Sequence, residues 1–359
     1  MNPTLECFRG LAALMVLVHH YSYLIDETLN QGGLHFFHTG VDLFFVITGL
    51  IFAPYLLGEV QQSVKAFAIR RAFRLYPLYL ISIAIAVLND WGQREGVATA
   101  AIKHLLFLQA LPLVDLESLR FFSLIYWTLP VEVMFYILVA GALIAFRRES
   151  HQINDEDRAK SLVRRYGFVA TLGFSLVYFA GFAPDSPSWV IRQAQLPALL
   201  LPFWFGMLIY FFRSSMEKSW PLRCFAVVSG GSLLFILYLV YPDVASSALT
   251  ARPFGFFNLL SGVGYALVLG GFLASRGKLT GVWARLAIFA GACSYGVYLF
   301  HEWTLRVVLR LLPNFSPMLQ VFIALVVVVV VAAILHRMIE SPLRAYGASL
   351  AARAARGSA

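Results

Sequence analysis

Residues 317–338 read PMLQVFIALVVVVVVAAILHRM, and this stretch decides the fold class. It contains six consecutive valines, Val326–Val331, and no Asp, Glu, Lys or Arg before Arg337. A helix needs about 20 mainly apolar residues to cross the hydrocarbon core of a bilayer. The stretch therefore predicts a membrane-spanning helix.

Nine further apolar stretches precede it, at residues 11–25, 37–57, 75–90, 123–146, 166–183, 194–212, 221–241, 255–275 and 286–304. Charged residues make up 13% of the 359 residues, against about 25% in soluble domains. The sequence predicts an all-α, polytopic integral membrane bundle of about ten transmembrane helices. Residues 101–114 are shorter and contain Lys103, so we expect an interfacial or half-inserted segment there.

Basic residues gather on one side of this predicted bundle. With a cytoplasmic N-terminus, 21 of the 28 Lys and Arg residues fall on the cytoplasmic side, as the positive-inside rule requires. Both termini are therefore predicted to be cytoplasmic, with a transmembrane domain at 1–345 and a short tail at 346–359. This basic inner rim explains the net charge of +9 without a nucleic-acid partner. The three cysteines are scattered, and no metal site is predicted.

Ionisable groups inside the apolar stretches are the functional candidates, because each costs about 2.5 to 3.5 kcal/mol on insertion scales. His20 follows Arg9 by eleven residues, which returns it to nearly the same helix face about 16 Å further along. His19 points about 80° away from Arg9 and is predicted to be a packing residue.

Two carboxylates lie in later stretches. Asp42 is near the outer end of the second, and Glu132 lies roughly 13 Å below the outer boundary in the fourth, one turn before Tyr136. Asp42 could instead complement the helix dipole, and Glu132 could belong to a structural ion pair.

Arg70, Arg71 and Arg74 lie together at the inner end of the third stretch. Their spacing brings them to a common side, and guanidinium groups suit phosphate, although the positive-inside rule alone would also place charge here. Tyr298 and His301 lie near the outer interface, where they could face a cavity or serve as anchors. The arginines mark a phosphate-binding end, and the outer histidines and carboxylates mark a proton-transfer end.

Five motifs in order produce a resemblance to a known family: FRGLAALMVLVHH at 8–20, GVDLFFVITGL at 40–50, RRAFRLYP at 70–77, WTLPVEVMFY at 127–136 and SYGVYLFHEW at 294–303. Over residues 5 to about 344 the chain resembles the acyltransferase 3 family of bacterial membrane proteins. The resemblance implies transfer of an acyl group, usually acetyl, from cytoplasmic acyl-CoA to a hydroxyl of O-antigen, exopolysaccharide, peptidoglycan or a lipid-linked glycan.

The resemblance also implies roles for single residues. Donor phosphates of acetyl-CoA would be bound by Arg9, Arg71 and Arg74, with Arg70 beside them. The catalytic residues would be His20 as general base, with Glu132 or Asp42 orienting its ring. The substrate-facing residues would be Trp127, Tyr136, Tyr298 and His301. Val133 stands after Glu132 where many members have a second acid, so a second-carboxylate role is not expected.

The implied setting is the bacterial cytoplasmic (inner) membrane, with membrane lipids and a carbohydrate acceptor as partners. Some members have an added extracytoplasmic domain, so a separate protein could accept the acyl group. Direct transfer to the hydroxyl is favoured over a covalent acyl-histidine. The alternatives are a transporter or flippase of acyl groups or glycans, for which no two-fold repeat is evident, and an intramembrane acyltransferase acting on lipid or protein.

The predicted topology is tested by reporter fusion. A reporter that is active only outside the cytoplasm, fused after Ala359, should stay silent, because the basic residues place that end inside. The same reporter in a predicted outer loop is the positive control. A strong signal from the C-terminal fusion would reverse the orientation and the side from which the donor enters.

Overall fold

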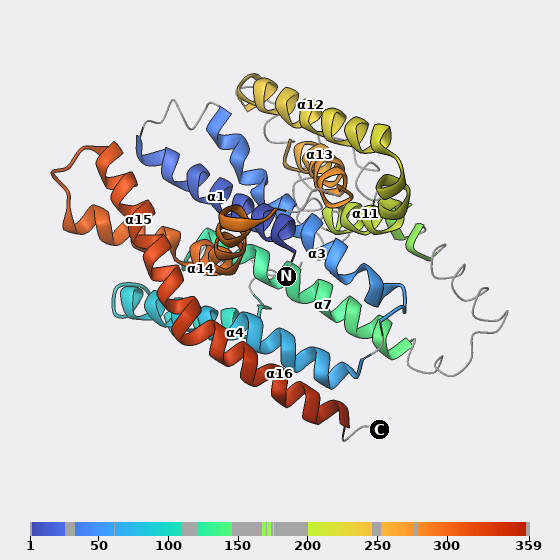
Figure 1. Cartoon of the computed structure of the whole chain (residues 1–359). Coiled ribbons are helices and arrows are strands. Elements are labelled where there is room, and N and C mark those ends of the chain that lie inside the picture. Colours follow the sequence, from blue (N-terminus) through green and yellow to red (C-terminus); the bar gives the residue numbers. More distant parts are fainter. Residues whose placement is uncertain are drawn as a thin grey trace. The chain divides into compact units, whose positions relative to one another are not determined.

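A computed structural model describes residues 2–25, 33–60, 62–108, 121–145, 167–169, 171–173, 175, 200–245, 253–275 and 279–356. Within these ranges the regular elements are helices and no strand occurs, which confirms the all-α class (Figure 1). The chain forms two compact units, described separately below. The first is Met1–Ala53 with Leu172–Ala332, and the second is Pro54–Thr171 with Ala333–Ala359.

The first unit contains α1 (Pro3–Ile25), η1 (Gly33–Thr39), α3 (Gly40–Leu56), α11 (Leu201–Lys218), α12 (Trp220–Ala245), α13 (Pro253–Leu273), α14 (Gly281–Leu311) and α15 (Pro317–Leu335). The second contains α4 (Val64–Asp90), α5 (Val97–Leu105), η3 (Leu124–Trp127), α7 (Thr128–Ala145), the π-turn η5 (His336–Glu340) and α16 (Ser341–Arg356). The last residues of α3 and of α15 pass into the second unit.

Six helical runs in the described part are long and apolar enough to cross a membrane: Gly33–Leu56, Val64–Asp90, Ile125–Ala145, Trp220–Tyr241, Gly281–Leu311 and Pro317–Arg356. The protein is therefore a multi-pass membrane protein. The predicted spans 11–25 and 255–275 also coincide with helices, namely α1 and α13, and the described part of 194–212 coincides with α11. Most of the span 166–183 lies outside the described residues, so the total of ten and the orientation stay predictions. The interfacial segment begins as α5, and its residues from 109 onward also lie outside them.

Small residues allow α1 and α14 to pack closely along each other. A Cβ atom on Gly10 would lie 2.6 Å from the Cβ of Ala290, and one on Gly291 would collide with Glu6. Helices in a membrane associate through van der Waals contact, and glycine lets their backbones approach. The α1–α14 pair thereby sets the spacing between the side chains that both helices direct into their interface.

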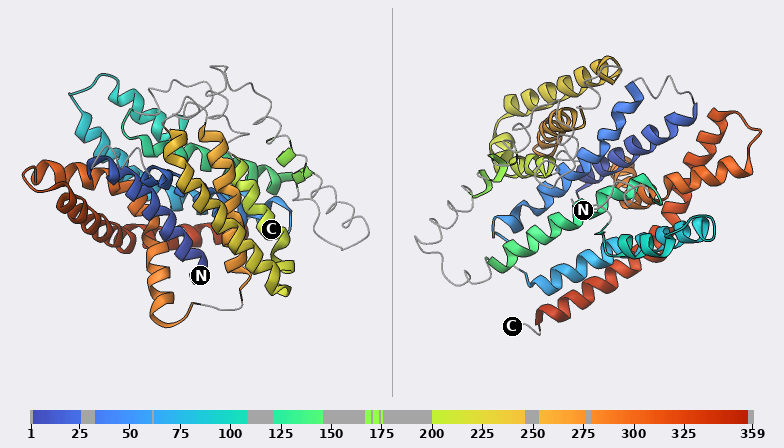
Figure 2. Two further views of the ribbon diagram at one scale, coloured as in Figure 1. Left: turned by 90° about the horizontal axis from the view of Figure 1, so that it is seen from above. Right: turned by 180° about the vertical axis from the view of Figure 1, so that it is seen from behind.

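A second close pair in this unit is α12 with α13, which run side by side in both views of Figure 2. A Cβ atom on Gly230 would lie 2.7 Å from the carbonyl oxygen of Gly264. On η1, Phe36 packs with Leu237 and Tyr241 of α12 in a buried apolar cluster. This contact holds η1, which leads directly into α3.

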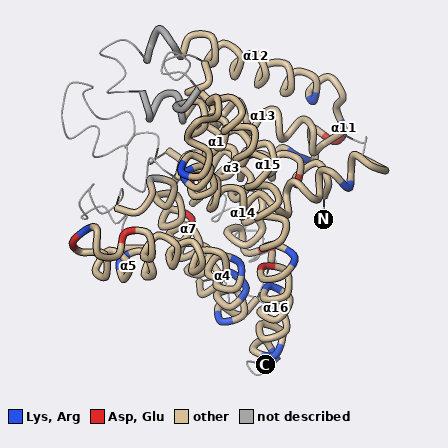
Figure 3. The backbone as a smooth tube through the Cα atoms, turned by 90° about the vertical axis from the view of Figure 1, so that its left-hand side faces the viewer, with Lys and Arg blue, Asp and Glu red and all other residues tan. Residues whose placement is uncertain are grey.

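In the second unit, α16 packs along α4, so residues 346–356, predicted to be a short tail, are helical and in contact with another helix. Gly347 lies directly against Phe73, and the ring of Tyr346 is 5.8 Å from that of Phe73. In Figure 3, basic positions occur along both α4 and α16. The π-turn joins α15 to α16. It lies just before Pro342, which has no N–H to donate to the carbonyl oxygen of Met338.

The glycine contact between α1 and α14 predicts a position-dependent effect of adding one methyl group. Gly10→Ala should lower the midpoint of thermal unfolding in detergent, since overpacking costs about 1 to 3 kcal/mol. Gly231→Ala is the matched control, because a Cβ atom there meets nothing within 4 Å and Ala is the better helix former. Equal midpoints for the two variants would contradict the packing argument.

Candidate active site

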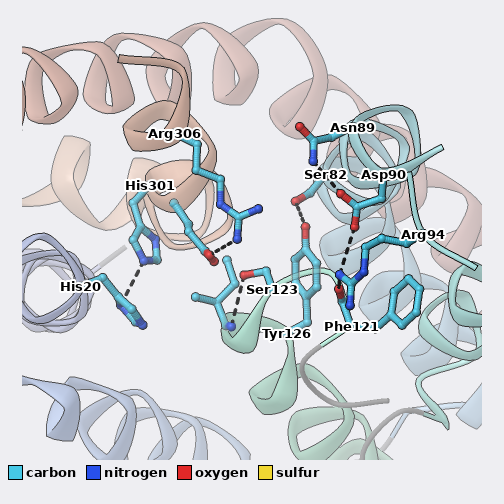
Figure 4. Close-up of polar contacts among 12 residues, drawn as sticks. His20, Ser82, Asn89, Asp90, Arg94, Phe121, Ser123, Tyr126, His301 and Arg306 are labelled. Atoms are coloured by element: carbon cyan, nitrogen blue, oxygen red, sulfur yellow. Dashed lines mark hydrogen bonds and ion pairs between the residues drawn. The ribbon is translucent and has the colours of Figure 1, made fainter. Parts of the chain in front are cut away.

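Two histidines from distant parts of the chain meet across the α1–α14 contact. The Nδ1 atom of His20 lies 3.1 Å from Nε2 of His301 (Figure 4). His301 is fully buried, whereas His20 is partly exposed. The pair therefore has one ring enclosed by protein and one ring that a substrate could reach.

The surrounding carbonyl groups determine which nitrogens hold the protons. Nδ1 of His301 lies 2.8 Å from the carbonyl oxygen of Tyr298 and 3.2 Å from that of Val297, so this nitrogen is the N–H donor. Its Nε2 is then the acceptor that faces His20. Nδ1 of His20 lies between this acceptor and the carbonyl oxygen of Val16 at 2.9 Å, so it too is protonated. In a neutral imidazole this leaves Nε2 of His20 as the proton acceptor.

A carboxylate next to the pair acts on the charge of His20. Glu302 acts electrostatically on His20 and accepts a hydrogen bond of 2.5 Å from Arg306. Arg306 also lies 4.9 Å above the ring of Trp303. If His20 takes up a proton, the charge of Glu302 favours the imidazolium that forms.

Tyr21 ties α1 to α14 at the level of the pair. Its hydroxyl donates to the carbonyl oxygen of His301 at 2.9 Å and lies 3.2 Å from the hydroxyl of Thr304. Tyr21 and His301 are both buried. This bond prevents the two helices from sliding and so maintains the contact between the histidines.

His19 has different neighbours from His20. Its side chain is 7% exposed, and its ring centroid lies 4.6 Å from that of His35 and 5.8 Å from that of His38, both on η1. The ring of Tyr241 is 5.3 Å from that of His35. Although these rings lie close together, no three His, Cys, Asp or Glu side chains in the described part of the chain converge as metal ligands.

Three other predicted site residues of the first unit have these surroundings. Arg9 forms an ion pair of 3.5 Å with the buried Glu6. Asp42 accepts a hydrogen bond of 2.7 Å from Ser261. Tyr298 is buried, and its ring is 6.2 Å from that of His301.

Charged neighbours of the candidate residues were missed in the sequence. Glu6 precedes Arg9 by three residues, and Arg306 follows Glu302 by four, so both pairs have the spacing of helical ion pairs. No spacing in the sequence indicates that His35 lies near His19, because only folding brings η1 to α1.

The second unit contains the arginine cluster. The guanidinium of Arg71 lies 5.8 Å from the ring of Phe67 and 5.7 Å from that of Tyr136. The Tyr136 hydroxyl donates to Glu132, and Arg70 donates to Gln62. The sequence grouped Glu132 with the outer histidines. In the structure α7 contacts α4, and Tyr136, which donates to Glu132, also lies beside Arg71. Helical periodicity within α7 could not show which helix would lie opposite.

Trp127 is the last residue of η3 and is partly exposed. Tyr126 beside it is fully buried, and its hydroxyl bonds to that of Ser82 on α4, as Figure 4 shows. In the same unit Arg94 forms an ion pair of 3.4 Å with Asp90. The bond between Tyr126 and Ser82 holds η3 against α4 directly before α7 begins.

Comparison with known proteins identifies the class as a membrane acyltransferase. The family model described as an acyltransferase domain matches residues 2–337. The chain therefore belongs to the acyltransferase 3 family.

Several relatives share modest identity. A protein of Acidianus two-tailed virus, provisionally named acetyltransferase ORF330, is 26% identical over 84% of this chain and 82% of its own length. Peptidoglycan O-acetyltransferase OatA of Listeria monocytogenes is 21% identical over 96% of this chain. A Staphylococcus aureus (strain COL) protein provisionally named as an O-acetyltransferase is 24% identical over the same share. The chain spans only 56% and 58% of the length of these two bacterial relatives. No solved structure matches it.

The different neighbours of the two adjacent histidines predict different outcomes for the same substitution. His20→Ala should reduce the rate of acyl transfer about 10² to 10⁴-fold, the usual range for loss of a general base. His19→Ala is the matched control and should keep most of the activity. The rates of the two variants are compared with purified proteins whose thermal unfolding midpoints are equal, so that loss of folding does not account for a difference. Equal losses, or the larger loss at His19, would show that His20 is not the base.

Proposed function

We propose that this protein transfers an acetyl group from acetyl-CoA to a hydroxyl group of a carbohydrate at the bacterial cytoplasmic membrane. The observation that carries the proposal is the hydrogen-bonded pair of His20 and His301, which leaves Nε2 of His20 as a proton acceptor on the accessible ring. Membership of the acyltransferase 3 family supports acyl transfer. The names of the relatives support acetyl as the group and oxygen as the accepting atom.

The chemical step follows from these protons. Nε2 of His20 takes the proton of the acceptor hydroxyl as its oxygen attacks the thioester carbonyl. The carbon–sulfur bond breaks, and the leaving thiolate takes up the proton, which gives free CoA and an ester. His301 accepts the Nδ1–H bond and holds the ring, while Glu302 stabilises the transient imidazolium. This scheme gives His301 and Glu302 the orienting and charge-stabilising tasks that the sequence assigned to Asp42 or Glu132.

For the donor we propose phosphate binding by the arginine cluster of the second unit. Arg71 and Arg74 lie near the start of α4, on the side predicted to face the cytoplasm, where CoA is available. Both are partly exposed. A planar guanidinium can form two parallel hydrogen bonds to one phosphate. Arg9 and Arg70 remain further candidates for donor binding.

For the acceptor we propose a surface or lipid-linked carbohydrate such as O-antigen, exopolysaccharide or peptidoglycan. OatA has peptidoglycan in its name and supports this class. Of the residues expected to face the substrate, Trp127 is partly exposed, whereas Tyr136, Tyr298 and His301 are buried.

The direct test is an assay on the purified protein. With radiolabelled acetyl-CoA and glycans extracted from a strain that lacks this gene, we expect free CoA to be released and the label to become attached to glycan. His20→Ala protein is the negative control. Movement of label across vesicles without release of CoA would identify a transporter instead.

Donor binding and chemistry can be separated by kinetics. Arg71→Ala and Arg74→Ala should raise KM for acetyl-CoA with little change in kcat, since a phosphate clamp contributes binding that is equal in the ground and transition states. Lys at these positions should restore part of the affinity. Arg213→Ala is the control, because Arg213 is half exposed and pairs only with Glu217 among the contacts described. A loss of kcat with an unchanged KM would contradict the assigned role.

A further inference from the structure

The C-terminal helix brings one more arginine to the arginine cluster of α4. Arg344 is on the first turn of α16, which packs along α4. It lies beyond residue 337, where the match to the family ends. Its side chain is 32% exposed and so is open to a solute.

The local sequence explains why Arg344 points toward α4. Pro342 has no backbone N–H and cannot donate the hydrogen bond that an α-helix needs. The chain forms the π-turn at His336–Glu340 just before it. From there, Gly347 fits against Phe73, which lies one residue before Arg74 on α4. Since Arg344 precedes Gly347 by three residues, both project from the same side of α16.

Charge supports the same arrangement. The charges of both Arg71 and Arg74 act on Arg344. Glu340, only 1% exposed, accepts bonds from His336 at 2.8 Å and from Arg344 at 3.4 Å. Together with Glu132, this makes two carboxylates near three arginines. The three guanidinium charges exceed the two carboxylate charges named here, so this group of residues attracts an anion.

We propose that Arg344 forms the third arm of the phosphate-binding cluster with Arg71 and Arg74, and that Glu340 holds its guanidinium in place. The inference rests on the proposed use of acyl-CoA. CoA suits three arms, because it presents a 3′-phosphate and a 5′-diphosphate. A guanidinium that reaches one phosphate oxygen forms a charge-assisted bond, about twice as strong as a neutral one.

The first test is equilibrium binding of radiolabelled CoA to the full-length protein in detergent. Arg344→Gln should weaken CoA binding about tenfold or more, the scale of one hydrogen bond to a charged group. It should also reduce the dependence of affinity on salt. Arg353→Gln, which changes an exposed arginine of the same helix, should bind as the unsubstituted protein does. Dephospho-CoA, which lacks the 3′-phosphate, tests which phosphate Arg344 contacts. If Arg344 contacts the 3′-phosphate, the Arg344→Gln protein should bind CoA and dephospho-CoA with equal affinity.

The second test needs no variant and therefore does not depend on folding of a mutant. Phenylglyoxal modification of the unsubstituted protein, read by peptide mass spectrometry, should show Arg344 protected by saturating CoA and Arg353 not protected. If the protein does not bind CoA at all, the proposed donor is wrong. If it binds CoA while Arg344 stays equally reactive and Arg344→Gln binds normally, the donor stands and the role of Arg344 is overturned.

Discussion

The close contact of α1 with α14 is the constraint on which the first unit depends. Gly10 and Gly291 let the two backbones approach, and the Tyr21 hydroxyl bonds to the carbonyl of His301 and stops the helices from sliding. In hydrocarbon, apolar side chains gain little from meeting each other, so close packing and hydrogen bonds must stabilise such a pair. The contact between His20 and His301 is a consequence of this packing.

Charges near the membrane-spanning helices occur with compensating neighbours. Arg9 pairs with Glu6, Arg306 with Glu302, and Arg344 with Glu340. Each pair is three or four residues apart on one helix. Pairing reduces the cost of placing an ionisable group at depth, and the buried carboxylates of Glu6 and Glu340 also restrict their arginines to a few orientations. The pairs therefore both lower the cost of insertion and orient the guanidinium groups.

The two units contain different chemical groups. The first unit contains the histidines, with Glu302 beside them, and these are groups for proton transfer. The second contains arginines on α4 and α16 together with Glu132 and Tyr136, and these are groups for binding an anion. Such a division suits the proposed transfer from a polyanionic donor to an uncharged hydroxyl.

The sequence by itself determined the all-α membrane class, the family and the candidate residues Arg9, His20, Arg71 and His301. Apolar runs of about 20 residues require helices in a bilayer, and the motifs are contiguous in the chain. Helical periodicity also separated His20 from His19, because it depends only on angles within one helix.

Only the tertiary structure decided which residues of different helices meet. It placed Nε2 of His301 against His20, joined Glu132 through Tyr136 to the neighbourhood of Arg71, and brought Arg344 to the arginines of α4. These contacts depend on which helix lies opposite, on glycines at the crossing points and on a π-turn before Pro342. Periodicity describes the face that a helix presents and says nothing about its neighbour, so partners hundreds of residues apart follow from packing alone.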